Sequence, residues 1–405
     1  MNDFDRELRD LRLAEDFGGV IRCVREAVTR DRLAAMTHWQ VKDWCGKRWR
    51  NLFLTEAVKD ETALVDARSR RAAKRKNRSD REWIARKFLR DPGRDEAEVE
   101  MPPAELTGLA NTTFIFCPGL LNGLLPVRAF QTSLPEIEKE YGIRVLRADL
   151  HPLAGCDKNA ESLAATIEKG LGLTADREVI APDEAVPPGD VFLMGYSKGM
   201  ADIVTLLATR PDLATRIRCV FGWAGAAGGS YVGDEAWKQL KDLEEDPERR
   251  DRIIAKLSPL TKLPEIVERR LDETDIKTAL LHLTTKFRQA FLHEHENAIN
   301  DLGIPIFNLV GSTNALEVPT FQIQGAAQLL PYDPCNDMQV TQDQARLRMP
   351  MATDLATLHA HHWDLAYEAF PKNLRRLSPH LDHPFPKKAA LLANIQLAHE
   401  LGLID

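Results

Sequence analysis

A serine flanked by glycines is the feature of this sequence with the clearest chemical meaning. The pattern Gly-x-Ser-x-Gly occupies residues 195–199, directly after an apolar run at 191–194 and before apolar residues at helical spacing. At a tight turn from a strand to a helix, a serine hydroxyl is exposed at the carboxyl end of the strand. Glycines two positions before and after the serine remove side chains that would collide with the backbone. The pattern and its context therefore predict that Ser197 is a nucleophile.

A nucleophilic serine needs a base, and a group of histidines late in the chain offers three candidates. We favour His362, because it directly precedes the apolar segment 363–366, which we expect to start a helix. His361 is the second candidate, and His359 is more typical of a surface or supporting position. The group also suggests a metal site, but no carboxylate or cysteine lies at ligand spacing, so we expect no metal.

The base in turn needs a carboxylate that orients it, placed between the serine and the histidine in the chain. Asp337 lies in a turn at 334–341 and would fix the tautomer of the imidazole. Asp333 is its rival, although an aspartate beside proline or asparagine is often only a turn former. We favour the order Ser197, Asp337, His362.

Two backbone N–H groups are expected to stabilise the oxyanion. One belongs to Lys198, the residue after the serine. The other belongs to Leu120, which follows an apolar strand and Pro118-Gly119, where glycine allows a close approach of the backbone. An ordinary turn is the alternative at Gly119. The Lys198 side chain is an unfavourable base, because neighbouring side chains at this turn diverge.

The elements around these residues alternate between strand and helix. Strands are expected at 112–117, 144–150, 190–195, 218–224 and 305–310, and helices at 130–141, 160–171 and 200–208. This alternation of strands and helices predicts an α/β fold with a parallel sheet covered on both faces. The charged interval 232–300 has helical periodicity and no clear strand, and we interpret it as a helical cap insertion over the site.

The first hundred residues have a different character. Apolar residues recur at helical spacing up to the acidic, proline-containing stretch 91–103. We therefore divide the chain into an all-helical extension, 1–105, and a catalytic domain, 106–405. The segment 68–90 is densely basic, which is typical of a solvated helix face. Contact with an anionic partner, such as a lipid surface or nucleic acid, is the alternative interpretation.

Composition narrows the possible classes of protein. The chain has 405 residues and a net charge of -7, which argues against a general nucleic-acid binder. No apolar run approaches the length of about 18 residues that a membrane span needs. The N-terminus is too acidic and too amphipathic for a secretory signal. The six cysteines are scattered without CxxC spacing, and several lie in apolar runs that favour reduced core thiols. We expect a cytoplasmic protein, and no cofactor is implied.

Four motifs together resemble the α/β-hydrolase superfamily, and within it bacterial triacylglycerol lipases and related esterases. They lie at residues 118–120, 195–199, 336–340 and 362–364. The resemblance implies an α/β-hydrolase fold and hydrolysis of a carboxylic ester with an acyl or lipid-like group. Two residues depart from the pattern of that family: Pro118 replaces a histidine, and Met338 replaces a glycine.

The same residues are compatible with other functions. A thioesterase, a polyhydroxyalkanoate depolymerase or an acyltransferase would use the same nucleophile, base and acid. A binding protein that has kept the fold and lost the reaction is the non-enzyme alternative. The full set of Ser197, Asp337 and His362 argues against that last possibility.

Overall fold

A seven-stranded sheet forms the centre of the computed structural model, which describes residues 3–68, 78–90, 99–120, 125–241 and 273–405. The strand order is β3-β2-β1-β4-β5-β6-β7, and only the β2–β3 pair is antiparallel. The strands are β1 (Thr112–Cys117), β2 (Arg144–Arg147), β3 (Leu173–Thr174), β4 (Asp190–Tyr196), β5 (Ile217–Trp223), β6 (Ile306–Ser312) and β7 (Ala352–His359). The α/β class expected from the sequence is confirmed.

The five expected strands are present with small shifts at their ends, and two further strands were not expected. The strand β3 has only two residues and leaves no periodicity to detect. The strand β7 is at the edge of the sheet and includes the exposed Asp354, which interrupts the apolar pattern of a buried strand. The segment after His362 is a run of turns rather than the expected start of a helix.

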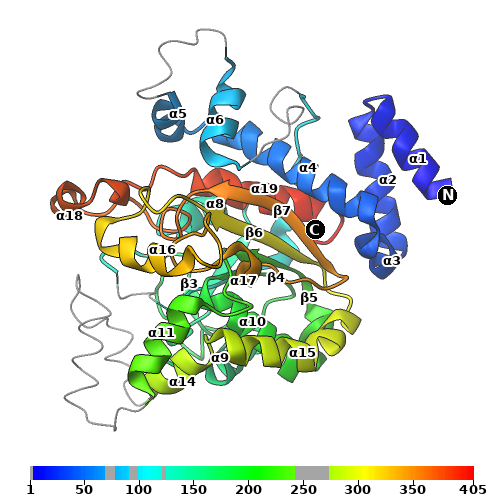
Figure 1. Cartoon of the computed structure of the whole chain (residues 1–405). Coiled ribbons are helices and arrows are strands. Elements are labelled where there is room, and N and C mark those ends of the chain that lie inside the picture. Colours follow the sequence, from blue (N-terminus) through cyan, green and yellow to red (C-terminus); the bar gives the residue numbers. More distant parts are fainter. Residues whose placement is uncertain (1–2, 69–77, 91–98, 121–124, 242–272) are drawn as a thin grey trace.

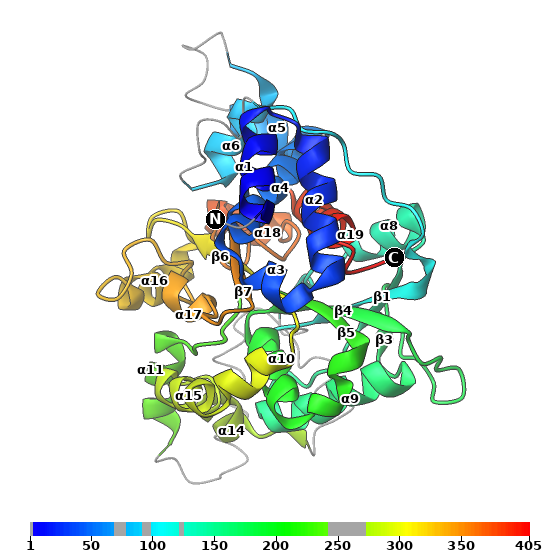
Figure 2. The same ribbon diagram turned by 90° about the vertical axis from the view of Figure 1, so that its right-hand side faces the viewer.

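Helices cover both faces of the sheet (Figures 1 and 2). One face carries α4 (Trp39–Ala57), α8 (Ser133–Tyr141) and α19 (Lys387–Glu400), and the other carries α9 (Cys156–Lys169), α10 (Lys198–Thr209) and α15 (Thr285–Asp301). Alternate residues of each central strand serve the two layers, because successive side chains point to opposite faces. Phe192 packs in the first layer, whereas Leu193 packs in the second.

The N-terminal helices belong to the first of these layers or pack against it. They are α1 (Asp3–Leu13), α2 (Phe17–Arg30), α3 (Arg32–Thr37), α4, α5 (Glu61–Arg68) and α6 (Asp80–Phe88). The indole N–H of Trp49 in α4 donates to Asn394 of α19 over 2.7 Å, and the buried Arg48 pairs with Glu400. The helices of residues 3–90 thus share a hydrophobic core with the sheet. The division of the chain at residue 105 stays a prediction.

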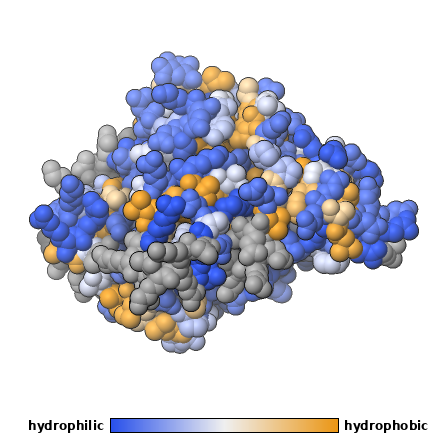
Figure 3. Space-filling view, turned by 90° about the horizontal axis from the view of Figure 1, so that it is seen from above, coloured by the Kyte–Doolittle hydropathy of each residue, from blue (hydrophilic) through white to orange (hydrophobic). Residues whose placement is uncertain are grey.

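The surface above these helices is mostly hydrophilic, with small and separate hydrophobic patches (Figure 3). Residues 69–77, the centre of the basic segment 68–90, lie outside the described residues, so its contact with an anionic partner stays a prediction. None of the helices in the described part of the chain combines the length and the apolar character needed to cross a bilayer.

The expected cap interval is described at its two ends. The helix α11 (Tyr231–Leu240) and α14 (Ile276–Leu281) pack together, and α15 follows. Residues 242–272 lie outside the described ranges. The remaining helices are α16 (Ile323–Leu329), α17 (Gln342–Ala345) and α18 (Lys372–Leu377), all between β6 and the C-terminal helix.

Candidate active site

Ser197 occupies a strained turn between the central strand β4 and helix α10. Its backbone has φ 55° and ψ −125°, values that L residues rarely adopt. The flanking glycines are sterically required. A Cβ at Gly195 would lie 2.6 Å from Met200 Cα, and one at Gly199 would lie 2.1 Å from the carbonyl oxygen of Cys117. The geometry is that of a sharp strand-to-helix turn, which exposes the serine at the carboxyl end of the strand.

His362 and Asp337 are brought together by the fold, although 25 positions separate them in the chain. The Nδ1 atom of His362 lies 2.7 Å from Oδ2 of Asp337, and both side chains are 1% exposed. His362 also donates its backbone N–H to the carbonyl oxygen of Asp337 over 2.9 Å. The carboxylate accepts a hydrogen bond, so Nδ1 carries the proton and Nε2 is left as the basic nitrogen.

The Nε2 atom of His362 is enclosed by the protein, and Tyr196 packs against the imidazole ring. Nε2 of His362 is buried and has no hydrogen-bond partner among the described residues. The ring of Tyr196, the residue before Ser197, lies 4.9 Å from the imidazole between centroids. The Tyr196 hydroxyl donates to the carbonyl oxygen of His362 over 3.0 Å. The loop that carries His362 is thereby tied to the turn at Ser197.

A tight turn holds the carboxylate of Asp337 in place. Its Oδ1 atom accepts the N–H of Val340 over 2.7 Å and the N–H of Gln339 over 3.0 Å, which leaves Oδ2 for the imidazole. Met338 has φ 78°, a conformation that glycine adopts more easily. Asn336 Oδ1 accepts the N–H of Met338 over 2.8 Å and supports this conformation. The turn therefore forms with methionine in the place of the glycine usual in the lipase pattern.

The rival residues from the sequence have other partners. Asp333 accepts backbone N–H groups of Cys335 and Gln342 and so stabilises a turn. His361 donates from Nε2 to the carbonyl oxygen of His380 over 2.8 Å.

His359, at the end of β7, lies 3.0 Å from a carboxylate oxygen of Glu317. This contact lowers the pKa of Glu317 to about 2. In the described ranges, no group of three or more histidine, cysteine and acidic side chains is arranged to hold a metal ion.

The loop after β1 runs directly against Ser197. A Cβ at Gly119 would lie 2.7 Å from Ser197 Cβ and 3.3 Å from its Oγ, so only glycine fits there without a shift. Leu120 follows this contact. Lys198 is the first residue of α10, and its N–H is one of the helix donors without an intrahelical acceptor. Both predicted oxyanion donors thus belong to segments that adjoin Ser197.

The predicted site residues come from loops at one edge of the sheet. Leu120 follows β1, Ser197 follows β4, Asp337 follows β6 and His362 follows β7. These four strands are parallel, so their carboxyl ends lie on the same edge, where ligands bind in open α/β sheets.

Comparison with solved structures agrees with this topology. The metagenomic carboxyl esterase MGS0156 superimposes with a TM-score of 0.62 at 19% identity, over 88% of this chain and 92% of that one. The chain has the α/β-hydrolase fold. The lipase BlEst2 of Bacillus licheniformis, in its mature form, has a TM-score of 0.43 at 22% identity, over 65% of this chain and 89% of that one. Lipase 1 from Pelosinus fermentans has a TM-score of 0.40 at 12% identity, over 63% of this chain and 93% of that one. No protein-family model and no curated protein matches the sequence.

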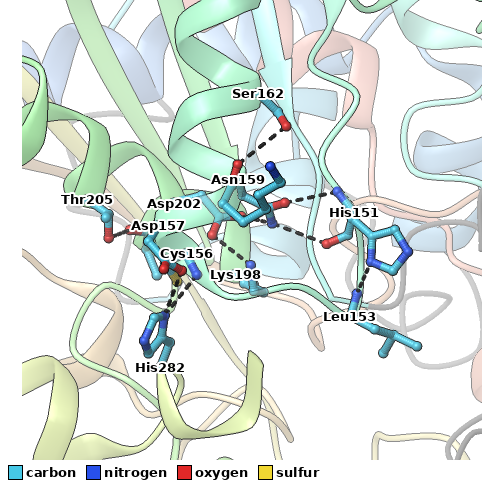
Figure 4. Close-up of polar contacts among 12 residues, drawn as sticks. His151, Leu153, Cys156, Asp157, Asn159, Ser162, Lys198, Asp202, Thr205 and His282 are labelled. Carbon is cyan, nitrogen blue, oxygen red and sulfur yellow. Dashed lines mark hydrogen bonds and ion pairs between the residues drawn. The ribbon is translucent and has the colours of Figure 1, made fainter. Parts of the chain in front are cut away.

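Beneath the turn at Ser197, the chain contains a buried polar network that was not expected from the sequence (Figure 4). Lys198 Nζ lies 2.7 Å from Asp202 Oδ1 one turn along α10. Asp202 Oδ2 accepts a hydrogen bond from Asn159 of α9 over 3.0 Å. Asn159 in turn exchanges hydrogen bonds with the backbone of His151, in the loop after β2. The network therefore ties the first turn of α10 to α9 and to that loop.

The sequence contains one signal for this network. Lys198 and Asp202 are spaced i,i+4 on a helix whose other side chains are mainly apolar. A charged pair at this spacing on a buried helix face indicates an internal ion pair.

Proposed function

We propose that this chain is a serine hydrolase that cleaves carboxylic esters. The observation that carries the proposal is the buried contact of 2.7 Å between Asp337 and His362, on a sheet edge shared with the strained Ser197. The α/β-hydrolase fold supports it, and the structural likeness to the carboxyl esterase MGS0156 agrees with it. Fold alone does not fix a reaction, so the proposal depends on the residues of the site.

The reaction proceeds through an acyl-enzyme. The hydroxyl of Ser197 attacks the ester carbonyl while Nε2 of His362 takes its proton, and Asp337 stabilises the imidazolium that forms. The N–H groups of Leu120 and Lys198 bind the oxyanion. His362 then gives the proton to the leaving alcohol and takes another from water, so that hydroxide attacks the acyl carbon. As the acid leaves, His362 returns this second proton to the Ser197 oxygen, which restores the hydroxyl.

Apolar packing near the oxyanion loop supports an apolar acyl group. Leu120 belongs to a cluster with Leu153 and the α11 and α14 residues Leu240, Ile276 and Leu280. An acyl chain beside such side chains is removed from water, which contributes about 0.8 kcal/mol per buried methylene group. We therefore expect kcat/KM to rise with the length of the acyl chain.

Hydrolysis of p-nitrophenyl esters by the Ser197→Ala variant tests the proposal. The variant should lose hydrolysis while its thermal unfolding matches that of the wild type, since only one hydroxyl is removed. A fluorophosphonate probe should label the wild type at Ser197 and leave the variant unlabelled. Retained hydrolysis by the variant, or an unlabelled wild type, would refute the proposal. A matched panel of esters, thioesters and polyesters then separates the related activities.

A further inference from the structure

Two aromatic residues end neighbouring central strands beside the candidate site. Tyr196 is the last residue of β4, Trp223 is the last residue of β5, and the two are partners in the parallel register of these strands. Residues in register project to the same face of a sheet. Both rings are buried in the layer that contains α4, α8 and α19. The two side chains therefore lie side by side on one face of the sheet, at the edge from which the site loops leave.

Both side chains donate a hydrogen bond to the turn that follows β7 and carries His362. The hydroxyl of Tyr196 donates to the carbonyl oxygen of His362 over 3.0 Å. The indole Nε1–H of Trp223 donates to the carbonyl oxygen of Leu365 over 3.1 Å. His362 and Leu365 are buried, and a buried carbonyl oxygen without a donor is costly. The ends of β4 and β5 thus hold this turn at two points, one of them the main chain of His362 itself.

The other hydrogen bonds of the turn fix its shape more than its place on the sheet. Within the turn, the N–H of Leu365 donates to the carbonyl oxygen of His361 over 3.3 Å. The N–H of His362 donates to the carbonyl oxygen of Asp337, which lies in a loop of its own. Groups supported by strands are held more precisely than groups supported by loops. The two aromatic donors therefore connect the turn to the central strands of the fold.

Neighbouring aromatic rings hold both donors in position. The rings of Phe130 and Phe385 pack edge-on to Trp223, with centroids 5.5 and 6.5 Å away. The ring of Tyr367 packs edge-on to Tyr196 at 6.0 Å. Edge-to-face contacts at these separations are favourable, and close packing in the core restricts the rotamers of the rings. Each donor is thereby fixed before it meets its carbonyl oxygen.

We propose that Tyr196 and Trp223 are positioning residues for His362, an inference that rests on the ester hydrolysis proposed above. Tyr196 directly precedes Ser197, so one short segment carries the proposed nucleophile and also holds the main chain of the proposed base. The ring of Tyr196 supports the imidazole as well, at 4.9 Å between centroids. The two hydrogen bonds thus set the place of His362 relative to Ser197, while Asp337 sets the orientation of its ring. A displacement of about 1 Å between reacting groups costs about 10² in rate.

Kinetics of variants that lose one donor test the proposal. Tyr196→Phe removes only a hydroxyl, and Trp223→Phe removes the indole N–H while it keeps an aromatic ring. In each variant, kcat for p-nitrophenyl esters should fall by at least about tenfold with KM little changed, because the base acts in the transition state and not in substrate binding. Tyr196→Leu also lacks the ring beside the imidazole, so its kcat should fall further than that of Tyr196→Phe.

Trp49→Phe is the matched control. The indole N–H of Trp49 is also buried, and it donates to Asn394 between α4 and α19 rather than to a site loop. This variant should be less stable to urea, as Trp223→Phe is, and should keep the kcat of the wild type. A loss of kcat in Trp223→Phe alone then separates positioning of the base from general weakening of the core.

Proton NMR gives a readout that needs no substrate. The proton on Nδ1 of His362 should resonate far downfield of the backbone amides, because its hydrogen bond to Asp337 is short and buried. Its disappearance in His362→Gln assigns the signal. In the Ser197→Ala chain, adding Tyr196→Phe or Trp223→Phe should weaken or abolish this signal through exchange with water. Adding Trp49→Phe should leave it unchanged.

The two measurements keep this inference apart from the proposed reaction. A wild type that hydrolyses no ester would refute the reaction, and the NMR signal would still report whether the tethers hold His362. The inference is overturned if Tyr196→Phe and Trp223→Phe keep the kcat of Trp49→Phe, or if both leave the signal unchanged. Should Trp223→Phe fail to fold, Tyr196→Phe decides both measurements, because it removes a single oxygen atom.

Discussion

Lys198 Nζ and Asp202 Oδ1 form an ion pair of 2.7 Å with both side chains only 1% exposed. The pair lies directly beneath Ser197, and Asp202 is further bound by Asn159. Removing one partner of a buried pair leaves the other charged and desolvated. The Lys198→Met variant should therefore lose about 3–5 kcal/mol of unfolding free energy, measured by urea denaturation.

Lys238→Met is the control for this prediction. Lys238 also pairs with a carboxylate on its own helix, Glu235, but the two side chains are 64% and 44% exposed. An exposed pair contributes about 0–1 kcal/mol, so this variant should unfold nearly as the wild type does. Equal losses of unfolding free energy in the two variants would contradict the prediction, because they would show that burial of the Lys198–Asp202 pair does not increase its contribution to stability.

Asp337→Asn tests the role proposed for the acid. An asparagine at this position keeps the size of the side chain but removes the charge that stabilises the imidazolium and fixes the tautomer of His362. We expect kcat for p-nitrophenyl esters to fall by about 10⁴, with the affinity for substrate little changed. Steady-state kinetics measure the effect.

Asp333→Asn is the matched control in the same loop. Asp333 binds the backbone N–H groups of Cys335 and Gln342, so its variant should lose some stability and keep most of kcat. A larger loss of kcat in Asp333→Asn than in Asp337→Asn would reverse the assignment of the acid.

Local patterns explain what the sequence predicts about the fold. The strands β1 and β4 contain apolar runs because the sheet buries both of their faces, and the residues of the turn at Ser197 form a continuous motif. The sequence pattern does not predict β7, because an edge strand mixes exposed and buried residues, such as Asp354 and Leu355. A pattern of hydrophobicity reports burial, so elements at the margin of the core leave weak signals.

Contacts between distant residues explain what the sequence leaves open in the site. It offers three histidines and two aspartates as candidates, and only the packing of β6 beside β7 places His362 against Asp337. The same holds for Asn159, whose hydrogen bond to Asp202 depends on how α9 packs on α10. Neither residue type nor spacing along the chain encodes these contacts.

His361 should make the protein less stable in mild acid. Burial lowers the pKa of its imidazole from 6.5 to about 4. Nε2 donates to the carbonyl oxygen of His380, and Nδ1 accepts the N–H of Asp364, so both nitrogens are satisfied in the neutral form. A proton on Nδ1 would point at the N–H of Asp364, so the charged imidazole would lose this hydrogen bond. In the unfolded chain the imidazole takes up a proton near pH 6.5, which favours unfolding.

The stability due to neutral His361 is therefore fully present above pH 6.5 and is lost as the pH falls toward 4. The slope is at most about 1.4 kcal/mol per pH unit for one proton. Burial lowers the pKa of His383 as well, so this histidine acts in the same direction. Urea unfolding from pH 7.5 to 4.5 should show a smaller slope for His361→Gln than for the wild type. His295→Gln, a change at a partly exposed side chain, should keep the slope of the wild type.

Gly119→Ala tests the contact between the loop after β1 and Ser197, the proposed nucleophile. The new methyl group would lie 2.7 Å from Ser197 Cβ and 3.2 Å from the carbonyl oxygen of Tyr196, so the loop or the elbow must shift. A displacement of about 1 Å at a reacting centre costs about 10² in rate. We therefore expect kcat/KM for p-nitrophenyl esters to fall by about two orders of magnitude, with a destabilisation of about 1–3 kcal/mol. Gly18→Ala is the control, because its Cβ would meet only side-chain atoms at 3.6 Å or more, within the first turn of α2. Unchanged kinetics in Gly119→Ala would mean that the Leu120 N–H is not held against Ser197 by this loop, and the second oxyanion donor would have to be sought elsewhere.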